Sequence, residues 1–267
     1  MSSITEATLP QTIDEVITAI EDLIEECITQ KDRLGYFAAL YHQITVKIKE
    51  GIANNEFDDG GRMERMDVIF ASRYLASVAA FRQKRDISAS WLVAFNGTRK
   101  WNALVLQHLL AAMNAHINYD LGVAAVETIG NGNILDIRKD FNQINSVIGL
   151  MLYEVLNELN RVSPLLSLFG LHASNNSILI QFSINNARDG AWSFAEDLNS
   201  SRTEADKNAT LISRDNTIEK LGVSLLQPKG LLAFTKWIIL LFEWKNPSRI
   251  IRAFYKYKRQ YISVNDQ

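Results

Sequence analysis

The chain has 267 residues, with 28 Lys and Arg, 30 Asp and Glu, and a formal net charge of -2. This length allows one large domain or two small ones with a full hydrophobic core, without help from disulfides or structural metals. The balanced charge and the pI near 6.1 give no sign of a nucleic-acid partner, and we expect none.

The composition fits a cytoplasmic protein. The single cysteine, Cys27, cannot form a disulfide within the chain. It shares an apolar helical stripe with Ile20, Leu23 and Ile24, which indicates a small core residue rather than a nucleophile. The first residues show neither the basic region nor the apolar run of a secretory signal peptide. We therefore expect a reducing, cytoplasmic location.

Few residues in this chain break helices, since only 4 are proline and 13 are glycine. Residues 1–10 are expected to be loose, and Thr12 with Glu15 forms the pattern of a capping box that starts a helix. Apolar periodicity predicts helices over 12–30, 36–53, 62–82, a short stretch after Ser88, 98–118, 136–161, 177–198, a stretch ending near 226, 231–242 and 246–267. No stretch alternates with period two. The sequence predicts a single all-α domain over residues 1–267, a bundle of about eight to ten helices.

Three of the predicted helices have a composition that indicates whether they are buried or exposed. The helix over 98–118 is apolar on most sides, as expected of a buried central helix. The run 231–242 is too short to cross a membrane, which takes about 20 residues, so a buried helix is favoured. The helix over 246–267 is basic and aromatic, with Arg249, Arg252 and Tyr255 among its residues. It is interpreted as a solvated outer helix, with peripheral contact to an anionic membrane surface as the alternative.

The most informative stretch is 107–120, where polar side chains interrupt the predicted central helix. His116 and Asp120 are four residues apart and so share one helix face, with His108 at its border. An imidazole and a carboxylate one turn apart make half of a site for one divalent metal such as Zn, Fe or Mn. They equally make a general base whose tautomer the carboxylate fixes. A third interpretation is a hydrogen-bonded pair that bridges helices without chemistry.

Other residues of the sequence are candidates for further metal ligands or for substrate contacts at this site. Asp67 is the first choice for an additional metal ligand, with His108, because it interrupts an apolar helix. The flanking Arg73 could neutralise Asp67 instead. The substrate contacts expected in a pocket here, by their place near the pair, are Asn114, Asn118, Arg73 and Tyr74.

Three strings of residues point to a known family. They are Met66 to Leu75 (MDVIFASRYL), Trp91 to Phe95 (WLVAF) and Met113 to Leu121 (MNAHINYDL). Together they resemble the bacterial family of domain of unknown function 5995, over roughly residues 35–245. The chain departs from the family's pattern in having Ala112 and Gly122 where members often have Gly and Pro. The resemblance implies that the histidine and aspartate form a site, but it implies no reaction.

A more distant likeness concerns the metal. The pair of His116 and Asp120 is similar to half of the zinc site in the helical phospholipase C and P1 nuclease group. Those proteins use several His/Asp clusters, whereas this chain has 4 histidines and no second pair with this spacing. The likeness implies at most a single metal ion here.

The leading hypothesis is an enzyme with a buried His/Asp/Asn pocket that acts on a mostly apolar small molecule. With a metal bound, the expected chemistry is hydrolysis by activated water. Without one, His116 held by Asp120 acts as acid and base. The alternative is a non-catalytic helical protein that binds an apolar or amphipathic ligand or associates with a membrane surface through its C-terminal helices. Motifs of serine hydrolases, phosphate-binding loops, Rossmann folds and His-Glu-x-x-His metalloproteases are absent from the sequence.

Overall fold

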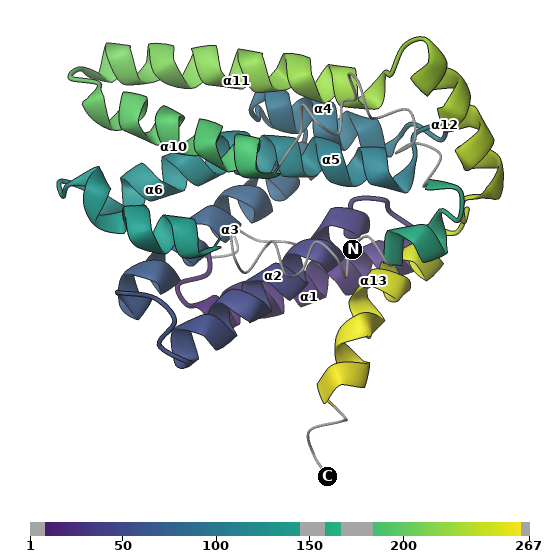
Figure 1. Ribbon diagram of the computed structural model, residues 1–267, viewed down its shortest axis with the longest axis horizontal. Coiled ribbons are helices and arrows are strands. Elements are labelled where there is room, and N and C mark those ends of the chain that lie inside the picture. Colours follow the sequence, from purple (N-terminus) through teal and green to yellow (C-terminus); the bar gives the residue numbers. More distant parts are fainter. Residues whose placement is uncertain (1–8, 145–157, 167–183, 263–267) are drawn as a thin grey trace.

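The computed structural model describes residues 9–144, 158–166 and 184–262. Every regular element in these ranges is a helix, which confirms the all-α prediction (Figure 1). The first three helices are α1 (Ile13–Gln30), α2 (Gly35–Ala53) and α3 (Gly60–Arg82). The hydroxyl of Thr12 accepts a 3.2 Å hydrogen bond from the Glu15 N–H and caps α1 as predicted. The Glu15 carboxylate accepts from the Gln11 N–H, so only half of the predicted capping box forms.

The middle of the chain differs from the single helix predicted over 98–118. There, α4 (Ala89–Thr98) is followed by α5 (Val105–Ala115), a π-helix, η1 (His116–Asp120), and α6 (Leu121–Ile129). Helix α5 starts seven residues later than predicted because its first N–H groups have side-chain partners. The Leu104 N–H donates to the Gln107 side chain, and the Val105 N–H donates to the Glu243 carboxylate at 3.1 Å. Beyond α6, a 3-10 helix, η2 (Ile134–Ile137), precedes helical residues 138–144.

From residue 184 to residue 262 the structure describes four helices. They are α10 (Ile184–Ser200), α11 (Glu204–Leu226), α12 (Leu231–Phe242) and α13 (Pro247–Ile262). Parts of the predicted helices over 136–161 and 177–198, namely residues 145–157 and 177–183, lie outside the described residues. The outer position predicted for the last helix holds for its first half, since Ile250, Ile251 and Phe254 are buried whereas Arg249 and Arg252 are exposed.

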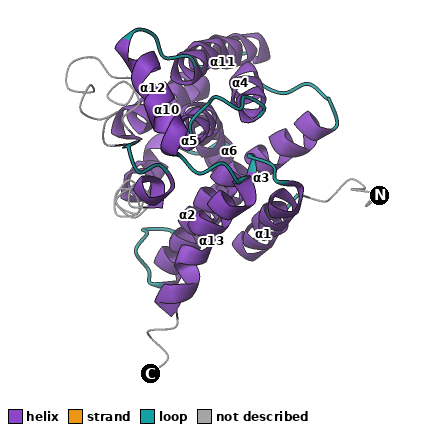
Figure 2. Cartoon of the chain, turned by 90° about the vertical axis from the view of Figure 1, so that its right-hand side faces the viewer, coloured by secondary structure: helices purple, strands orange, loops and turns teal. Residues whose placement is uncertain are grey.

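Helix α5 lies at the centre of the bundle and confirms the prediction of a buried central helix. It contacts α2, α4 and α11 on its different sides, and ten of its eleven residues are buried. Helices α1, α2 and α13 pack together along one side of the molecule (Figures 1 and 2). Helices α10 and α6 pack against each other as a second group. Helix α3 contacts α1 and α2 of the first group and α6 of the second. This arrangement places η1, the continuation of α5, between α3 and α10 in the interior.

The prediction that residues 231–242 form a buried helix is wrong for one of its faces. Thr235, Lys236, Ile239 and Leu240 face the protein. The opposite face exposes large apolar side chains: Leu231, Phe234, Trp237, Leu241 and Phe242. The two polar residues of this run, Thr235 and Lys236, lie on the buried side, so the sequence pattern did not indicate which face packs, and the described residues cover α12 on one side only. Among the described residues, no single helix has the length and apolar character to cross a membrane. Helices α11 and α12 together have that length and apolar character, but the pair is bent by 61°.

Candidate active site around His116 and Asp120

His116 and Asp120 form a buried hydrogen-bonded pair at the two ends of the π-helix. Their side chains are each 2% exposed, and Nδ1 of His116 lies 3.1 Å from Oδ2 of Asp120. The N–H of Leu121 donates to the carbonyl of His116, five residues back, as a π-helix requires. Short π-helical turns occur mostly as local bulges and often at functional sites. The spacing in the sequence therefore predicted the contact correctly, although the local helix type differs.

The Asp120 carboxylate accepts hydrogen bonds from three side chains. Nε of Arg73 donates to Oδ1 at 3.0 Å, and Nε1 of Trp91 donates to Oδ2 at 2.8 Å. His116 is the third donor. Because an ionised carboxylate only accepts, Nδ1 of His116 carries the proton of this bond. Arg73 also reaches Glu127 at 3.4 Å, so it joins the pair to the protein surface.

Aromatic rings enclose the imidazole of His116. Phe70 stacks on it with ring centroids 3.6 Å apart, and Tyr41 meets it edge-on at 4.7 Å. Phe37, Tyr74 and Trp91 complete the enclosure with centroids 5.7–5.8 Å away. Burial lowers the pKa of His116, and the contact with Asp120 opposes part of that shift. The second ring nitrogen, Nε2, has no hydrogen-bond partner among the described residues.

The two asparagines predicted as substrate contacts serve to hold helices together. Nδ2 of Asn114 donates to the Ile218 carbonyl at 2.8 Å, and Nδ2 of Asn118 donates to Asn114 at 3.1 Å. Arg214 of α11 donates to the Asn118 carbonyl at 2.9 Å. These bonds fix α5 and η1 against α11 and use the polar atoms that a substrate would need. The third predicted contact, Tyr74, is buried in the aromatic enclosure, and only Arg73 is in part accessible, at 27% of its side chain.

The structure does not bring the four predicted metal ligands together. Asp67 and His108 are buried, but the described residues contain no group of three or more His, Cys, Asp or Glu side chains placed to hold a metal ion. Both carboxylate oxygens of Asp67 lack a hydrogen-bond partner in the described part of the chain, and burial raises the pKa of Asp67 to about 8. Arg73 pairs with Asp120 and not with Asp67. Burial lowers the pKa of His108 to about 3, and a cavity of about 10 Å³ separates it from Tyr74.

A surface cleft of about 260 Å³ reaches Asp120 from outside, but His116 does not line it. Asp120, Arg73 and Trp91 form its inner end, and Tyr119 and Ile212 contribute apolar surface. Asp215 lies at its rim, where its carboxylate accepts from the N–H groups of Ala89 and Ser90 at the start of α4. The cleft therefore offers one accessible cation, Arg73, beside an apolar wall.

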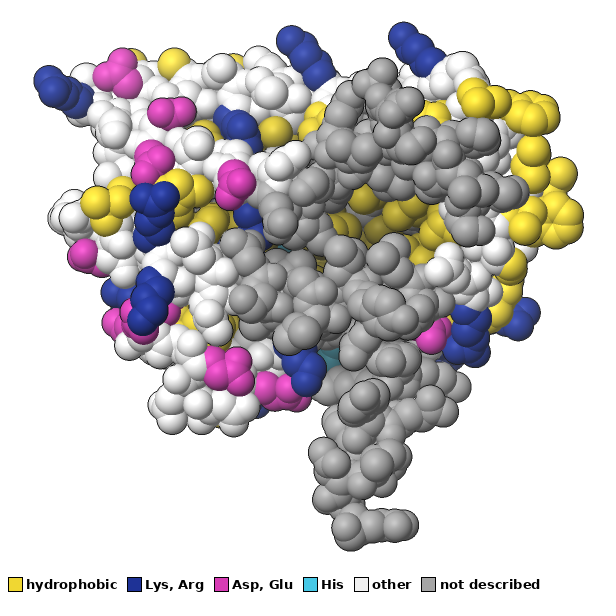
Figure 3. Space-filling view, viewed as in Figure 1, with side chains coloured by type: hydrophobic (Ala, Val, Ile, Leu, Met, Phe, Trp, Pro, Cys, Tyr) yellow, Lys and Arg dark blue, Asp and Glu magenta, His cyan; other side chains and the backbone are white. Residues whose placement is uncertain are grey.

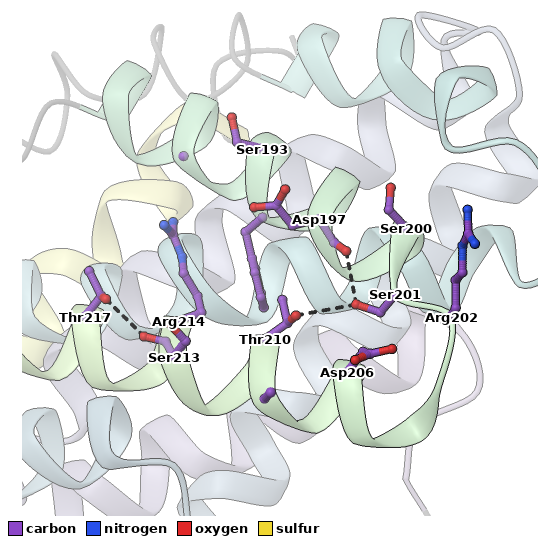
Figure 4. A pocket seen from close by; sticks show the side chains of 13 residues that line it. Ser193, Asp197, Ser200, Ser201, Arg202, Asp206, Thr210, Ser213, Arg214 and Thr217 are labelled. Atoms are coloured by element: carbon purple, nitrogen blue, oxygen red, sulfur yellow. Dashed lines mark hydrogen bonds between the residues drawn. The ribbon is translucent and has the colours of Figure 1, made fainter.

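A larger open groove of about 780 Å³ lies between α10 and α11 (Figure 4). Its wall is rich in hydroxyl groups, but many of these donate to carbonyls of their own helix. Ser200 donates to Glu196, Ser201 to Asp197 and Thr217 to Ser213. None of the predicted site residues lines this groove, which has the character of a solvated gap between helices.

Trp91 and Arg214 are among the residues of the site that were not predicted from the sequence. Trp91 was noted only in a short helix and in the family string WLVAF, although an indole N–H in a core requires an acceptor and so pointed to a buried polar partner. Arg214 had no distinguishing signal, because its contact with Asn118 spans 96 residues of sequence.

A comparison with protein families places the chain among known sequences. The model of the family of unknown function DUF5995 matches residues 13–228, a range that includes His116, Asp120, Arg73 and Trp91. The chain belongs to this family. No curated protein and no solved structure matches the chain. The match confirms the resemblance to the family, whereas the motif strings and the more distant likeness to zinc phospholipases and nucleases receive no support from it. Gly122 lies in the first turn of α6 rather than in a turn between elements.

Proposed function

We propose that this protein is a cytoplasmic enzyme of small-molecule metabolism in which His116 acts as general acid and base. The observation that carries the proposal is the hydrogen bonding of the His116 imidazole, with one ring nitrogen bonded and the other without a partner among the described residues. Asp120 holds the proton on Nδ1, which leaves a lone pair on Nε2 with no partner. The lowered pKa of His116 keeps the ring neutral at pH 7 and able to accept a proton.

The chemistry of the cleft indicates the class of substrate. Tyr119 and Ile212 fit a mostly apolar molecule, and Arg73 fits a polar or anionic end group. His116 is 1% exposed, so a substrate reaches Nε2 only after a side chain in its path moves. Arg73 is the accessible member of the cluster and has Glu127 as a second partner, so its movement would deepen the cleft at Asp120. Substrate binding would then exchange the Arg73–Asp120 bond for a bond to the substrate.

A metal-assisted hydrolase is the less favoured form of the enzyme. The Asp120 oxygens already accept from three side chains, and Asp67 and His108 do not complete a set of ligands with His116. The donor set of the described residues does not fit a metal ion such as Zn. No step of the proposed chemistry passes through a metal.

The second candidate function is non-catalytic binding of the same apolar or amphipathic ligand. It is favoured by the enclosure of His116, since the cleft ends at Arg73, Trp91 and Asp120 and not at the imidazole. In that case the ligand contacts Arg73 and the apolar wall, and His116 contributes only to the support of Asp120.

An activity screen with a matched pair of variants tests the proposal. The purified protein is incubated with an extract of apolar metabolites, and products are followed by mass spectrometry. His116→Asn retains an amide N–H for Asp120 in place of Nδ1–H but lacks the basic Nε2. We expect it to fold, as checked by circular dichroism, and to lose conversion by at least about 100-fold. His108→Asn changes a buried histidine outside the site and should convert normally. Equal conversion by His116→Asn contradicts the acid–base role, and retention of a compound without conversion supports the second candidate.

A further inference from the structure

Helix α12 presents an apolar face to solvent that no described residue covers. Leu241, Phe234 and Phe242 are 76%, 64% and 60% exposed, and Leu231 and Trp237 lie on the same side of the helix. The space-filling view shows these hydrophobic side chains gathered along one edge of the molecule (Figure 3). Single exposed apolar residues are common on proteins, but a contiguous set of large ones marks an interaction surface.

A second element extends this face. Trp101, in the loop between α4 and α5, is 70% exposed, and its ring meets that of Trp237 with centroids 5.8 Å apart. The α12 face is therefore defined by residues from two segments: Trp101, Leu231, Phe234, Trp237, Leu241 and Phe242. Because α12 also packs inward through Ile239 and Leu240, the face is held in place on the body of the protein.

The two sequence segments that carry the α12 face contain charged residues of one sign. Residues 97–107 and 227–242 contain no Asp or Glu, and they contain four cationic residues: Arg99, Lys100, Lys229 and Lys236. Arg99 and Lys229 are exposed and Lys100 is half-buried, whereas Lys236 is buried and faces the protein. Burial, and then the neighbouring charge of Lys100, lower the pKa of Lys236. An anionic partner would offset the charges of the three accessible cations.

We propose that the α12 face docks on an anionic lipid bilayer. Tryptophan and phenylalanine beside lysine are the side chains that enter the headgroup region of a membrane, and a helix with one apolar face lies in that plane. A second copy of the chain fits less well, because a two-fold contact would bring together two faces whose segments carry cations and no Asp or Glu. The proposal does not depend on the role proposed for His116. Of the two C-terminal helices predicted to meet a membrane surface, it assigns the contact to α12, together with Trp101.

Flotation of the full chain with lipid vesicles tests this proposal. Vesicles of phosphatidylcholine are compared with vesicles that also contain phosphatidylglycerol. We expect the protein to float with the anionic vesicles and to remain below with the neutral ones. The double variant Phe234→Ser/Phe242→Ser should lose flotation, whereas Leu135→Ser, an exposed leucine on η2, should float like the unchanged protein.

A charge variant and a measurement of mass separate the alternatives. Lys100→Gln/Lys229→Gln should weaken binding to anionic vesicles about fivefold per lysine and leave the folded state unchanged. The proposal is overturned if the unchanged protein floats with neither type of vesicle, or if Leu135→Ser lowers flotation as much as the double variant. It is also overturned if light scattering shows a dimer that Phe234→Ser/Phe242→Ser dissociates while vesicles are not bound.

Discussion

The indole Nε1 of Trp91 donates a 2.8 Å hydrogen bond to Oδ2 of Asp120, with both side chains buried. This bond joins α4 to η1, two elements that α5 separates along the chain. It also occupies the same carboxylate oxygen that accepts from His116. The position of the carboxylate, and through it the orientation of the imidazole, therefore depends on a residue 29 positions away in the sequence.

The first prediction concerns this bond. Trp91→Phe removes the donor and keeps most of the aromatic packing, so we expect the free energy of unfolding to fall by about 1–3 kcal/mol, the range for a buried bond to a charged group. Urea unfolding followed by circular dichroism measures the change. Trp101→Phe, an exposed ring with no such bond, should change stability by less than about 0.5 kcal/mol. If the two variants unfold alike, the Trp91–Asp120 bond has no net role in stability.

The second prediction follows from Asp67. Burial raises its pKa to about 8, so between its unfolded value near 4 and pH 8 the folded chain holds a proton that the unfolded chain releases. The unfolded state then binds fewer protons, and stability falls as pH rises through this window. Asp67→Asn cannot ionise, and its stability relative to the unchanged protein should rise by at least about 2 kcal/mol from pH 5 to pH 8.

Denaturant unfolding at several pH values checks this. Asp22→Asn, which changes an exposed carboxylate, serves as the matched control and should keep the pH dependence of the unchanged protein. Parallel stability curves for Asp67→Asn and the unchanged protein would show that Asp67 does not titrate in this window.

The third prediction concerns Gly122, where α6 crosses α10. A Cβ at this position would lie 2.6 Å from Cδ1 of Phe194 and 2.9 Å from the carbonyl oxygen of Ala191. A backbone carbonyl cannot rotate away as a flexible side chain can, so the helices must separate. Gly122→Ala should therefore cost about 1–3 kcal/mol by overpacking.

The control for Gly122 is Gly61 in α3, where a Cβ would meet only the Asp59 side chain at 3.7 Å. Gly61→Ala should leave stability unchanged or raise it by up to about 1 kcal/mol, because alanine favours helix. Thermal unfolding compares the two variants. Equal melting temperatures would mean that α6 and α10 pack less closely than described.

Local patterns in the sequence predicted the helices well, and long-range contacts explain where they failed. Caps such as Thr12 and apolar periodicity act within one helix, so the start of α1 was predicted within one residue. The start of α5 depends on the Glu243 carboxylate, 138 residues away, which no local pattern reveals. The exposed face of α12 was missed for a related reason: burial depends on which neighbours pack against a helix, not on its own apolar content.

The residues of the candidate site likewise include some that a local pattern predicted and some whose contacts depend on how the helices pack. The contact of His116 with Asp120 could be predicted because residues four apart share a helix face. Arg73 was expected near the site as a substrate contact, but its bond to Asp120 depends on how α3 packs against η1. Asn114 and Asn118 share the segment with the pair yet point to α11, because side chains on one helix face different partners.

The protonation state of the His116 imidazole shows whether His116 is a base held by Asp120. In a protein labelled with ¹⁵N at histidine, long-range nitrogen–proton NMR spectra report which ring nitrogen carries the proton. We expect a neutral imidazole at pH 7 with the proton on Nδ1, an unprotonated Nε2, and a pKa below 6.5. A proton on Nε2, or a pKa above 6.5, would contradict the assignment of His116 as a base held by Asp120.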